Sequence, residues 1–291
     1  MDTILHITSG DIAGGAIEKS GLPGELFVWH DILYDGPRKP GWPSDTMLND
    51  RALFLEGVTG GGMEKEQVLQ TLRDQYRKIA AGANYGQIVL WFDACLFDQS
   101  MLVHLLVLLH SLNIRKVELL CVAAFPGIEP FDGLGQLQPA QLASLYDQRR
   151  EVTEAQFQFA QVVDSAFARQ DFFQLDEISE KSAAPLPWVP AAAARWIQEQ
   201  PDPVTGLGRL EQLVLDAIGN GCMTPWEIFS AVAANDRHPQ YWGDITLWAK
   251  INGLADRDPP LVRIEGPLQR LPQWKSDVDW KQFTITGLPV S

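Results

Sequence analysis

The sequence predicts an α/β fold: a mostly parallel sheet flanked by helices in a Rossmann-like three-layer arrangement, followed by a smaller winged-helix-like α+β domain. Short apolar runs alternate with helix-like periodicity between residues 3 and 123, and this alternation is typical of parallel sheets. The 291 residues exceed the size of most single domains. Hydrophobic residues make up 46% of the chain and charged residues 21%, which is the composition of a globular protein.

The first predicted strand ends in a glycine turn that opens a helix. Residues 4–7 supply the apolar run of an interior strand, and Ser9-Gly10 breaks this run. A helix of small residues is expected from Asp11 onward. Because ligands bind at the carboxyl ends of the strands in open α/β sheets, this polar turn is the first place to look for a site.

Three further strands and several helices follow the same alternation. Apolar runs predict strands at 25–30, 87–92 and 116–123. Apolar residues at helical spacing predict helices near 49–56, 68–79 and 98–109. From residue 139 the pattern is helical and includes a capping box at 153–156, and no further strand is predicted before residue 261.

Composition divides the chain into three parts. We expect an α/β domain over residues 1–180, a Pro-rich linker with a short helix over 181–202, and a winged-helix-like domain over 203–291. Three helices in the last part precede β-rich runs at 261–265 and 283–286, which can pair as a hairpin. The second of these helices begins with a capping box and an N1 proline at 224–227.

The charge of the chain argues against a nucleic-acid partner. The net charge is −14, and residues 203–291 contain eight Lys/Arg against ten Asp/Glu, whereas phosphate contacts require cations. The helix near 243–253, which would enter a DNA groove, offers one lysine, Lys250. Beside it lie Leu247, Trp248 and Ile251, which we expect to be buried in the core rather than available for DNA.

Cysteine usage and the lack of targeting signals predict a soluble, cytoplasmic protein. Cys95, Cys121 and Cys222 are far apart and fit neither a disulfide framework nor zinc-ligand spacing. The N-terminus has no basic region followed by an apolar core, so no signal peptide is expected. The longest apolar run, near 101–109, is far shorter than the ~20 residues that span a bilayer, and no membrane association is expected.

Polar side chains gather at the predicted ends of the first three strands, where parallel pairing would bring them together. The candidate catalytic residues are Asp31, Asp93 and His6. The candidate ligand-binding residues are Ser9, Gly10, Asp11, Asp98, Gln99 and Arg51. Carboxylates can hold a divalent cation such as Mg²⁺ or Mn²⁺ or act as acid and base, and the glycine turn with its helix N-terminus offers N–H groups to an anion.

Several of these residues also have a structural interpretation. Asp11 and Asp98 precede predicted helices, so both can be N-caps. His6 lies in the middle of an apolar strand, where a buried histidine with satisfied hydrogen bonds is the more common case. The sequence has no G-x-G-x-x-G fingerprint, Walker lysine or G-x-S-x-G elbow, so neither a nucleotide site nor a hydrolase nucleophile is indicated.

The strand-end motifs resemble those of a bacterial family of unknown function, the DUF1835 family. The motifs are His6-Ile7-Thr8-Ser9-Gly10-Asp11, Trp29-His30-Asp31-Ile32-Leu33, Trp91-Phe92-Asp93 with Asp98 and Gln99, and Leu134-Gly135-Gln136-Leu137. The resemblance covers roughly residues 3–170, and the stretch 243–248 is similar to the region that often follows this domain. The resemblance identifies the motif positions of the family but implies no activity. Ala94-Cys95 stands where the family commonly shows a glutamate or another polar residue after the third strand.

Two hypotheses for function follow from these observations. The first is that the α/β domain binds or turns over a small anionic or phosphorylated ligand at the strand ends, with metal assistance. The alternative is a non-enzymatic regulator or adaptor that uses residues 203–291 to contact another protein. The two hypotheses differ in the part of the chain that carries function.

Overall fold

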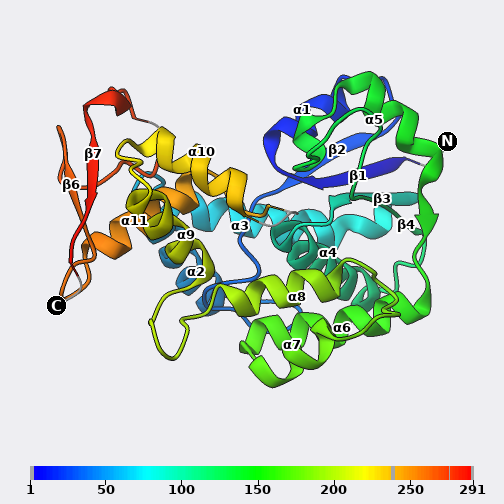
Figure 1. The fold of residues 1–291 in the computed structure, drawn as a ribbon. Helices are drawn as coiled ribbons and strands as arrows, with labels where there is room; N and C mark the ends of the chain where they lie inside the picture. Colours follow the sequence, from blue (N-terminus) through cyan, green and yellow to red (C-terminus); the bar gives the residue numbers. More distant parts are fainter. Residues whose placement is uncertain (1–2, 237–239, 275, 290–291) are drawn as a thin grey trace.

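A computed structural model describes residues 3–236, 240–274 and 276–289 and has a mixed α/β fold (Figure 1). Four strands are parallel, and they are β1 (Ile4–Ser9), β2 (Glu25–Trp29), β3 (Gln87–Asp93) and β4 (Val117–Val122). A fifth strand, β5 (Arg150–Glu151), is antiparallel to β4. The strand order is β2-β1-β3-β4-β5. The predicted mostly parallel sheet is therefore confirmed.

Strand β5 is the element that the sequence did not indicate, because no strand was predicted between β4 and residue 261. It contains two residues, Arg150 and Glu151, and both are exposed. A strand this short and polar has no apolar run or alternation from which it can be recognised. Its pairing with Leu119 and Glu118 of β4 depends on a tertiary contact.

Helices cover both faces of the sheet (Figure 1). The helices packed on one face are α1 (Asp11–Glu18) and α5 (Pro139–Leu145). The core on the other face contains residues of α3 (Lys65–Ala80), α4 (Leu96–Ser111), α6 (Glu154–Arg169), α7 (Phe172–Ser179) and α8 (Val189–Gln198). Among the described residues, no helix has the length and apolar character needed to cross a membrane.

Burial on both faces explains why the central strands were recognisable in the sequence. In β3, Leu90 and Phe92 belong to the core that contains α4, whereas Val89 and Trp91 belong to the core that contains α1. Successive side chains of a strand point to opposite faces, so a strand buried on both faces is a continuous apolar run. The same holds for β1, whose residues from Leu5 onward are all buried.

The segment 181–202 contains the expected short helix, α8, and this helix belongs to the core of the sheet unit. Val189, Ala192, Ala193 and Trp196 of α8 are buried in the same cluster as the strands. The Trp196 indole N–H also donates a hydrogen bond of 2.8 Å to the backbone oxygen of Tyr34. Since these side chains pack inward, the segment does not form an extended connection.

The remaining chain forms a smaller unit of three helices and a two-stranded antiparallel ribbon. Its elements are α9 (Arg209–Gly219), α10 (Pro225–Asn235), α11 (Asp244–Ala255), β6 (Val262–Glu265) and β7 (Thr284–Gly287). The Thr224 capping box starts α10 as expected. Leu247, Trp248 and Ile251 of α11 are buried, which confirms the prediction that these side chains are committed to the core.

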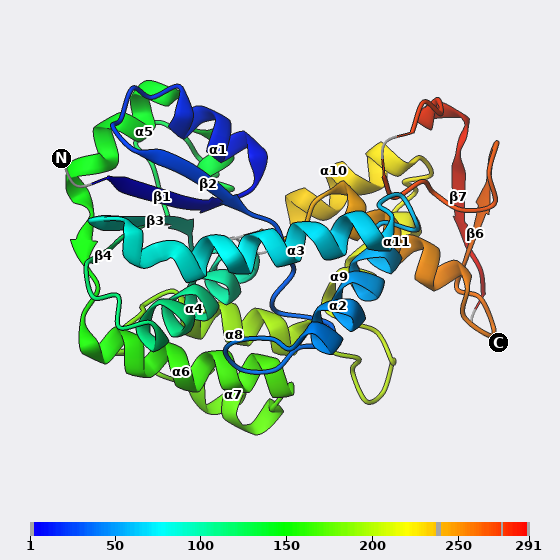
Figure 2. The same cartoon turned by 180° about the vertical axis from the view of Figure 1, so that it is seen from behind.

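Hydrogen bonds connect the smaller unit to the sheet unit. The Arg195 guanidinium of α8 donates two hydrogen bonds to the Asp236 carboxylate, of 2.8 and 2.9 Å. The Gln273 side chain donates to the backbone oxygen of Val58, at the end of α2 (Asp45–Val58), over 2.7 Å. Figure 2 shows α2 beside α11, and the two helices are in contact.

Candidate functional site

The strand order reverses at β1, and this reversal defines the position of the candidate site. β1 lies between β2 and β3, and the following helices α1 and α4 pack on opposite faces of the sheet. In such sheets a crevice opens at the carboxyl ends of the strands where the connections diverge. In this sheet the switch point lies between Ser9-Gly10, after β1, and Asp93, at the end of β3, and we call this region the β1–β3 crevice.

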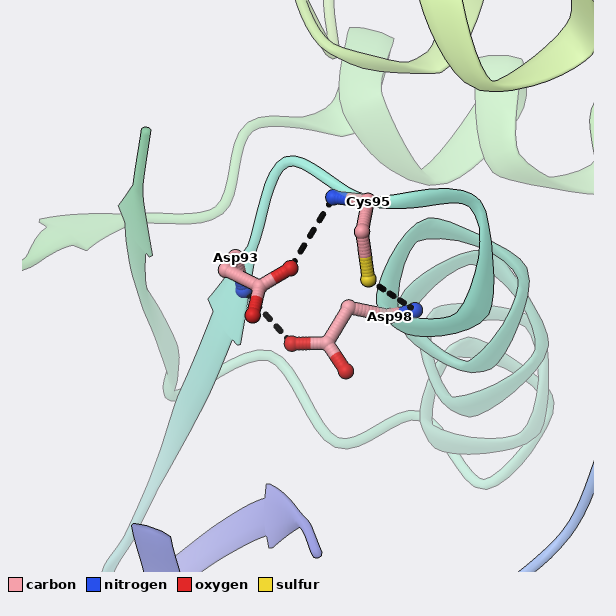
Figure 3. Close-up of side chains that lie close together, drawn as sticks. All are labelled: Asp93, Cys95 and Asp98. Carbon is pink, nitrogen blue, oxygen red and sulfur yellow. Dashed lines mark hydrogen bonds between the residues drawn. The ribbon is translucent and has the colours of Figure 1, made fainter. Parts of the chain in front are cut away.

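Two carboxylates, Asp93 and Asp98, lie together at this crevice (Figure 3). Asp98 Oδ2 accepts a hydrogen bond of 2.6 Å from the backbone N–H of Asp93. Its Oδ1 is hydrogen-bonded to the Ser9 hydroxyl, which comes from the neighbouring strand. Asp98 therefore joins the ends of β1 and β3 to the first turn of α4.

Cys95, rather than Asp98, occupies the N-cap position of α4. Its backbone is extended, and its Sγ accepts a hydrogen bond of 3.4 Å from the backbone N–H of Asp98, the third helical residue. Asp11 is likewise the first residue of α1, after Gly10 at the cap position. The interpretation of Asp11 and Asp98 as N-caps is therefore wrong, because both residues lie inside the first turn of their helices.

Burial favours the protonated forms of the side chains in this cluster. It raises the pKa of Asp93, and it raises the pKa of Asp98 well above its usual range, where the charge of Asp93 adds to the effect. Burial and the two carboxylates also raise the pKa of the Cys95 thiol well above its ordinary value. Among the described residues, neither carboxylate forms an ion pair with a cation, so the pair is expected to retain a proton at neutral pH.

The N-terminus of α1 faces the crevice beside this pair. Gly10 has φ +72° and ψ 138°, a conformation that side-chain-bearing residues rarely adopt. No side chain caps α1, so the N–H groups of its first turn have no side-chain acceptor. Free N–H groups and the helix dipole together attract anions to such a terminus.

The loop after β4 covers Asp93. Gly133 has φ +135°, and a Cβ atom there would overlap a carboxylate oxygen of Asp93. The loop borders a small, partly open pocket of about 10 Å³ lined by Asp93, Ala94, Val122, Ala123, Phe131, Asp132 and Gly133. That volume corresponds to roughly one water molecule. A ligand larger than a water molecule therefore does not fit between this loop and Asp93.

The structure brings five of the nine candidate residues together: Ser9, Gly10, Asp93, Asp98 and Gln99. Gln99 completes the group because its Nε2 donates a hydrogen bond of 2.6 Å to the backbone oxygen of Asp93. It also lies 3.4 Å from Cys121 Sγ in β4. The carboxyl ends of three strands are thus tied to α4.

Asp31 and Arg51 form a separate buried ion pair. Arg51 Nε donates a hydrogen bond of 2.8 Å to Asp31 Oδ1, and its guanidinium also bonds the backbone oxygens of Asp35 and Ile32. Both side chains therefore hold the loop after β2 on α2. In this arrangement Asp31 is a structural anchor, and β2 at the sheet edge carries it away from the β1–β3 crevice.

His6 and Asp11 also lie apart from the carboxylate pair. His6 is buried, with Trp91 Nε1 3.1 Å from its Nδ1 and the Pro23 backbone oxygen 3.1 Å from its Nε2. Burial lowers its pKa, so it is a neutral histidine with both ring nitrogens engaged. The Asp11 side chain is 84% exposed and hydrogen-bonded to His30 Nε2 at 2.8 Å.

Sequence reasoning missed the roles of Cys95 and Gly133. Cys95 is a buried free thiol, and its position as the N-cap of α4 was not foreseen. Gly133 precedes the motif at 134–137, which was recognised only through a resemblance. Its close approach to Asp93 had no signal in the sequence other than the glycine itself.

The same cluster contains the donors that a metal ion would require. The nearest ligand atoms of Asp93, Cys95 and Asp98 lie within 4.8 Å of one another. Mg²⁺ prefers six oxygen ligands, whereas a sulfur beside carboxylate oxygens suits a softer ion such as Zn²⁺. The donor set therefore fits the expected Mg²⁺ or Mn²⁺ less well than Zn²⁺.

Comparison with known proteins leaves the chemistry to be argued from this geometry. The sequence matches no protein-family model, and no curated protein matches it. The resemblance to the DUF1835 family therefore stays a prediction.

Proposed function

We propose that the sheet unit binds a small anionic ligand at the β1–β3 crevice, with Asp93 and Asp98 as an acid–base pair. One observation carries the proposal: a carboxylate pair with raised pKa values adjoins a helix N-terminus that no side chain caps. Perturbed carboxylates in a crevice are typical of functional sites. A strand-end crevice is also where α/β sheets bind their ligands.

The two halves of the site have compatible charges only while the carboxylate pair is protonated. The first turn of α1 supplies N–H donors for an anion, and Gly10 lets the backbone approach it closely. A neutral carboxylic acid next to that anion does not repel it and can donate a proton to it. Loss of the proton at higher pH would add negative charge at the site and weaken binding.

The proposal also includes a fold type, a family and a cellular compartment for the chain. The strand order and the reversal at β1 support a Rossmann-like sheet unit, and three helices with a ribbon support a winged-helix-like C-terminal unit. Motifs spread over several strand ends support membership of the DUF1835 family. Three free cysteines support a reducing, cytoplasmic environment.

A charge placed at the N-terminus of α1 tests the anion site. The position for this charge is Ile12, the second residue of α1, which is 75% exposed. The control position is Phe173, the second residue of α7, which is 79% exposed. Thermal unfolding is followed with inorganic phosphate and with a ribose phosphate, each with and without Mg²⁺, Mn²⁺ or Zn²⁺. At about 100 times its Kd, a ligand should stabilise the wild type by about 2.7 kcal/mol.

Ile12→Glu should lose this stabilisation because it adds an unpaired carboxylate at this helix end, where the Asp11 carboxylate is already hydrogen-bonded to His30. The matched control Phe173→Glu should keep it. No shift of the wild type with either phosphate, or equal shifts in both variants, would refute the proposal. A shift that requires Zn²⁺ would assign the metal to Asp93, Cys95 and Asp98.

A second candidate function, as an adaptor, has one observation in its favour. Trp226 of α10 is 45% exposed and packs on the rings of Trp248 and Trp280. It borders an open hollow of about 520 Å³ that also includes Lys281. Exposed tryptophan is enriched where proteins bind one another. Sedimentation of the wild type and of Trp226→Ala over a range of concentrations tests whether this surface joins two copies of the chain.

A further inference from the structure

A larger cavity, of about 210 Å³, lies at the antiparallel edge of the sheet. Its apolar walls are formed by Leu102 of α4, Leu119 of β4, Leu186 and the half-exposed Trp188. Side chains alternate along β4, so Leu119 and Cys121 line this cavity, whereas Leu120 and Val122 pack on the opposite face in the core that contains α1. The cavity is therefore on the other side of the sheet from α1.

One cation, Arg150, lines the cavity. It is paired with Leu119 across the β4–β5 ladder, and directly paired residues place their side chains on the same face. Its guanidinium donates hydrogen bonds to the backbone oxygens of Asp147 and Arg149, and it forms no ion pair with a described carboxylate. Glu151 also borders the cavity. It is paired with Glu118, and paired residues share a face, so its side chain points to the opposite face of the sheet from Arg150.

Two of the glutamines that line the cavity, Gln156 and Gln99, are held in place by hydrogen bonds to the backbone. Gln156 Oε1 accepts a hydrogen bond from the backbone N–H of Thr153, and its Nε2 donates to the Pro185 backbone oxygen, which holds the segment before Trp188 against α6. Gln99 is 1% exposed and uses its Nε2 to bond Asp93. Its Oε1 accepts no hydrogen bond from a described residue and remains available to a ligand.

We propose that this cavity binds a small organic carboxylate with an apolar, preferably aromatic, body. The carboxylate pairs with Arg150, whose planar guanidinium suits a carboxylate in two parallel hydrogen bonds. The body lies against Trp188 and the leucines, where an aromatic ring can stack on the indole. Neither contact depends on the β1–β3 crevice.

Titration calorimetry with phenylacetate and phenylacetamide tests the proposal, because the two probes share a shape and differ in charge. The wild type should bind phenylacetate at least about tenfold more tightly, a difference of about 1.4 kcal/mol. Arg150→Gln should abolish that preference, and Trp188→Ala should weaken both probes about equally. Arg169→Gln, at an exposed arginine at the end of α6, is the matched control and should behave as the wild type.

The crevice variant Ile12→Glu should bind phenylacetate unchanged, which separates this cavity from the anion site. Urea unfolding of each variant verifies that it is folded, as expected for substitutions at exposed and half-exposed side chains. Absence of saturable binding to the wild type would overturn the proposal. Equal affinity for the two probes, or a preference that survives Arg150→Gln, would overturn it as well.

Discussion

Two buried side-chain clusters, one around Asp164 and one around Asp98, give their carboxylates opposite electrostatic environments. Asp164 of α6 accepts a hydrogen bond of 2.6 Å from Arg38 and lies 3.1 Å from His104 Nδ1. Asp98 is equally buried, but its partners are the Ser9 hydroxyl, the Asp93 backbone and a second carboxylate. The first cluster supplies cations for its carboxylate, and the second does not.

The protonation of the two clusters differs accordingly. Burial alone would raise the pKa of Asp164, but the charges of His104 and Arg38 outweigh it and place that pKa well below its usual range. For Asp98, burial raises the pKa and Asp93 raises it further. Equal burial therefore favours the ionised form of Asp164, which serves as a structural anchor, and the protonated form of Asp98, which is a candidate for chemistry.

The largest expected effect is on stability, from the same substitution in the two clusters. Asp164→Asn removes the anion beside Arg38 and leaves a buried cation uncompensated, which should cost about 3–5 kcal/mol of unfolding free energy. Asp98→Asn keeps both hydrogen bonds, since its amide can donate to Ser9 and accept from Asp93, and it removes the cost of keeping a buried carboxyl protonated at neutral pH. It should therefore leave stability unchanged or raise it. Urea unfolding at neutral pH measures both values, and similar losses at the two sites would contradict the comparison.

A moderate effect is expected at the turn that delivers Ser9 to Asp98. Gly10→Ala introduces a Cβ at φ +72° and should cost about 1–3 kcal/mol through backbone strain, although the space around it is open. Gly15→Ala is the control, because Gly15 lies inside α1 with equally open space, and it should stabilise by roughly 0.5–1 kcal/mol. Equal effects of the two substitutions on thermal unfolding would show that Gly10 is not strained.

The smallest effect is a difference in pH dependence. The folded pKa of Asp98 is raised, so the native state binds more protons than the unfolded state, and wild-type stability relative to Asp98→Asn should fall as pH rises above about 3.9. The folded pKa of Asp164 is depressed, so the wild-type advantage over Asp164→Asn should be present above about pH 3.9 and be lost as pH falls through the folded pKa.

Urea midpoints of the wild type and the two Asn variants between about pH 2 and 8 measure these slopes. Each slope is limited to about 1.4 kcal/mol per pH unit for each proton that is bound or released. Slopes of the same sign for the two difference curves would show that the two carboxylates share one kind of environment.

Local sequence determined most of the elements, because their signals come from residues within one or two turns. The apolar runs of β1 and β3 were recognisable since both faces of these strands are buried. Thr153 and Thr224 marked helix starts through capping boxes that need only four consecutive residues. Ser9 and Gly10 identified the turn where the carboxylate pair was later found.

Tertiary structure alone decided which of the strand-end residues meet. Asp31 and Asp93 looked equivalent in the sequence, since each follows a strand, but β3 is central whereas β2 is at the edge, and Arg51 neutralises Asp31. The two-residue strand β5 and the inward packing of α8 likewise depend on partners distant in sequence. Strand order and ion pairing are long-range contacts, and the periodicity of a single segment contains no information about the segment that will pack beside it.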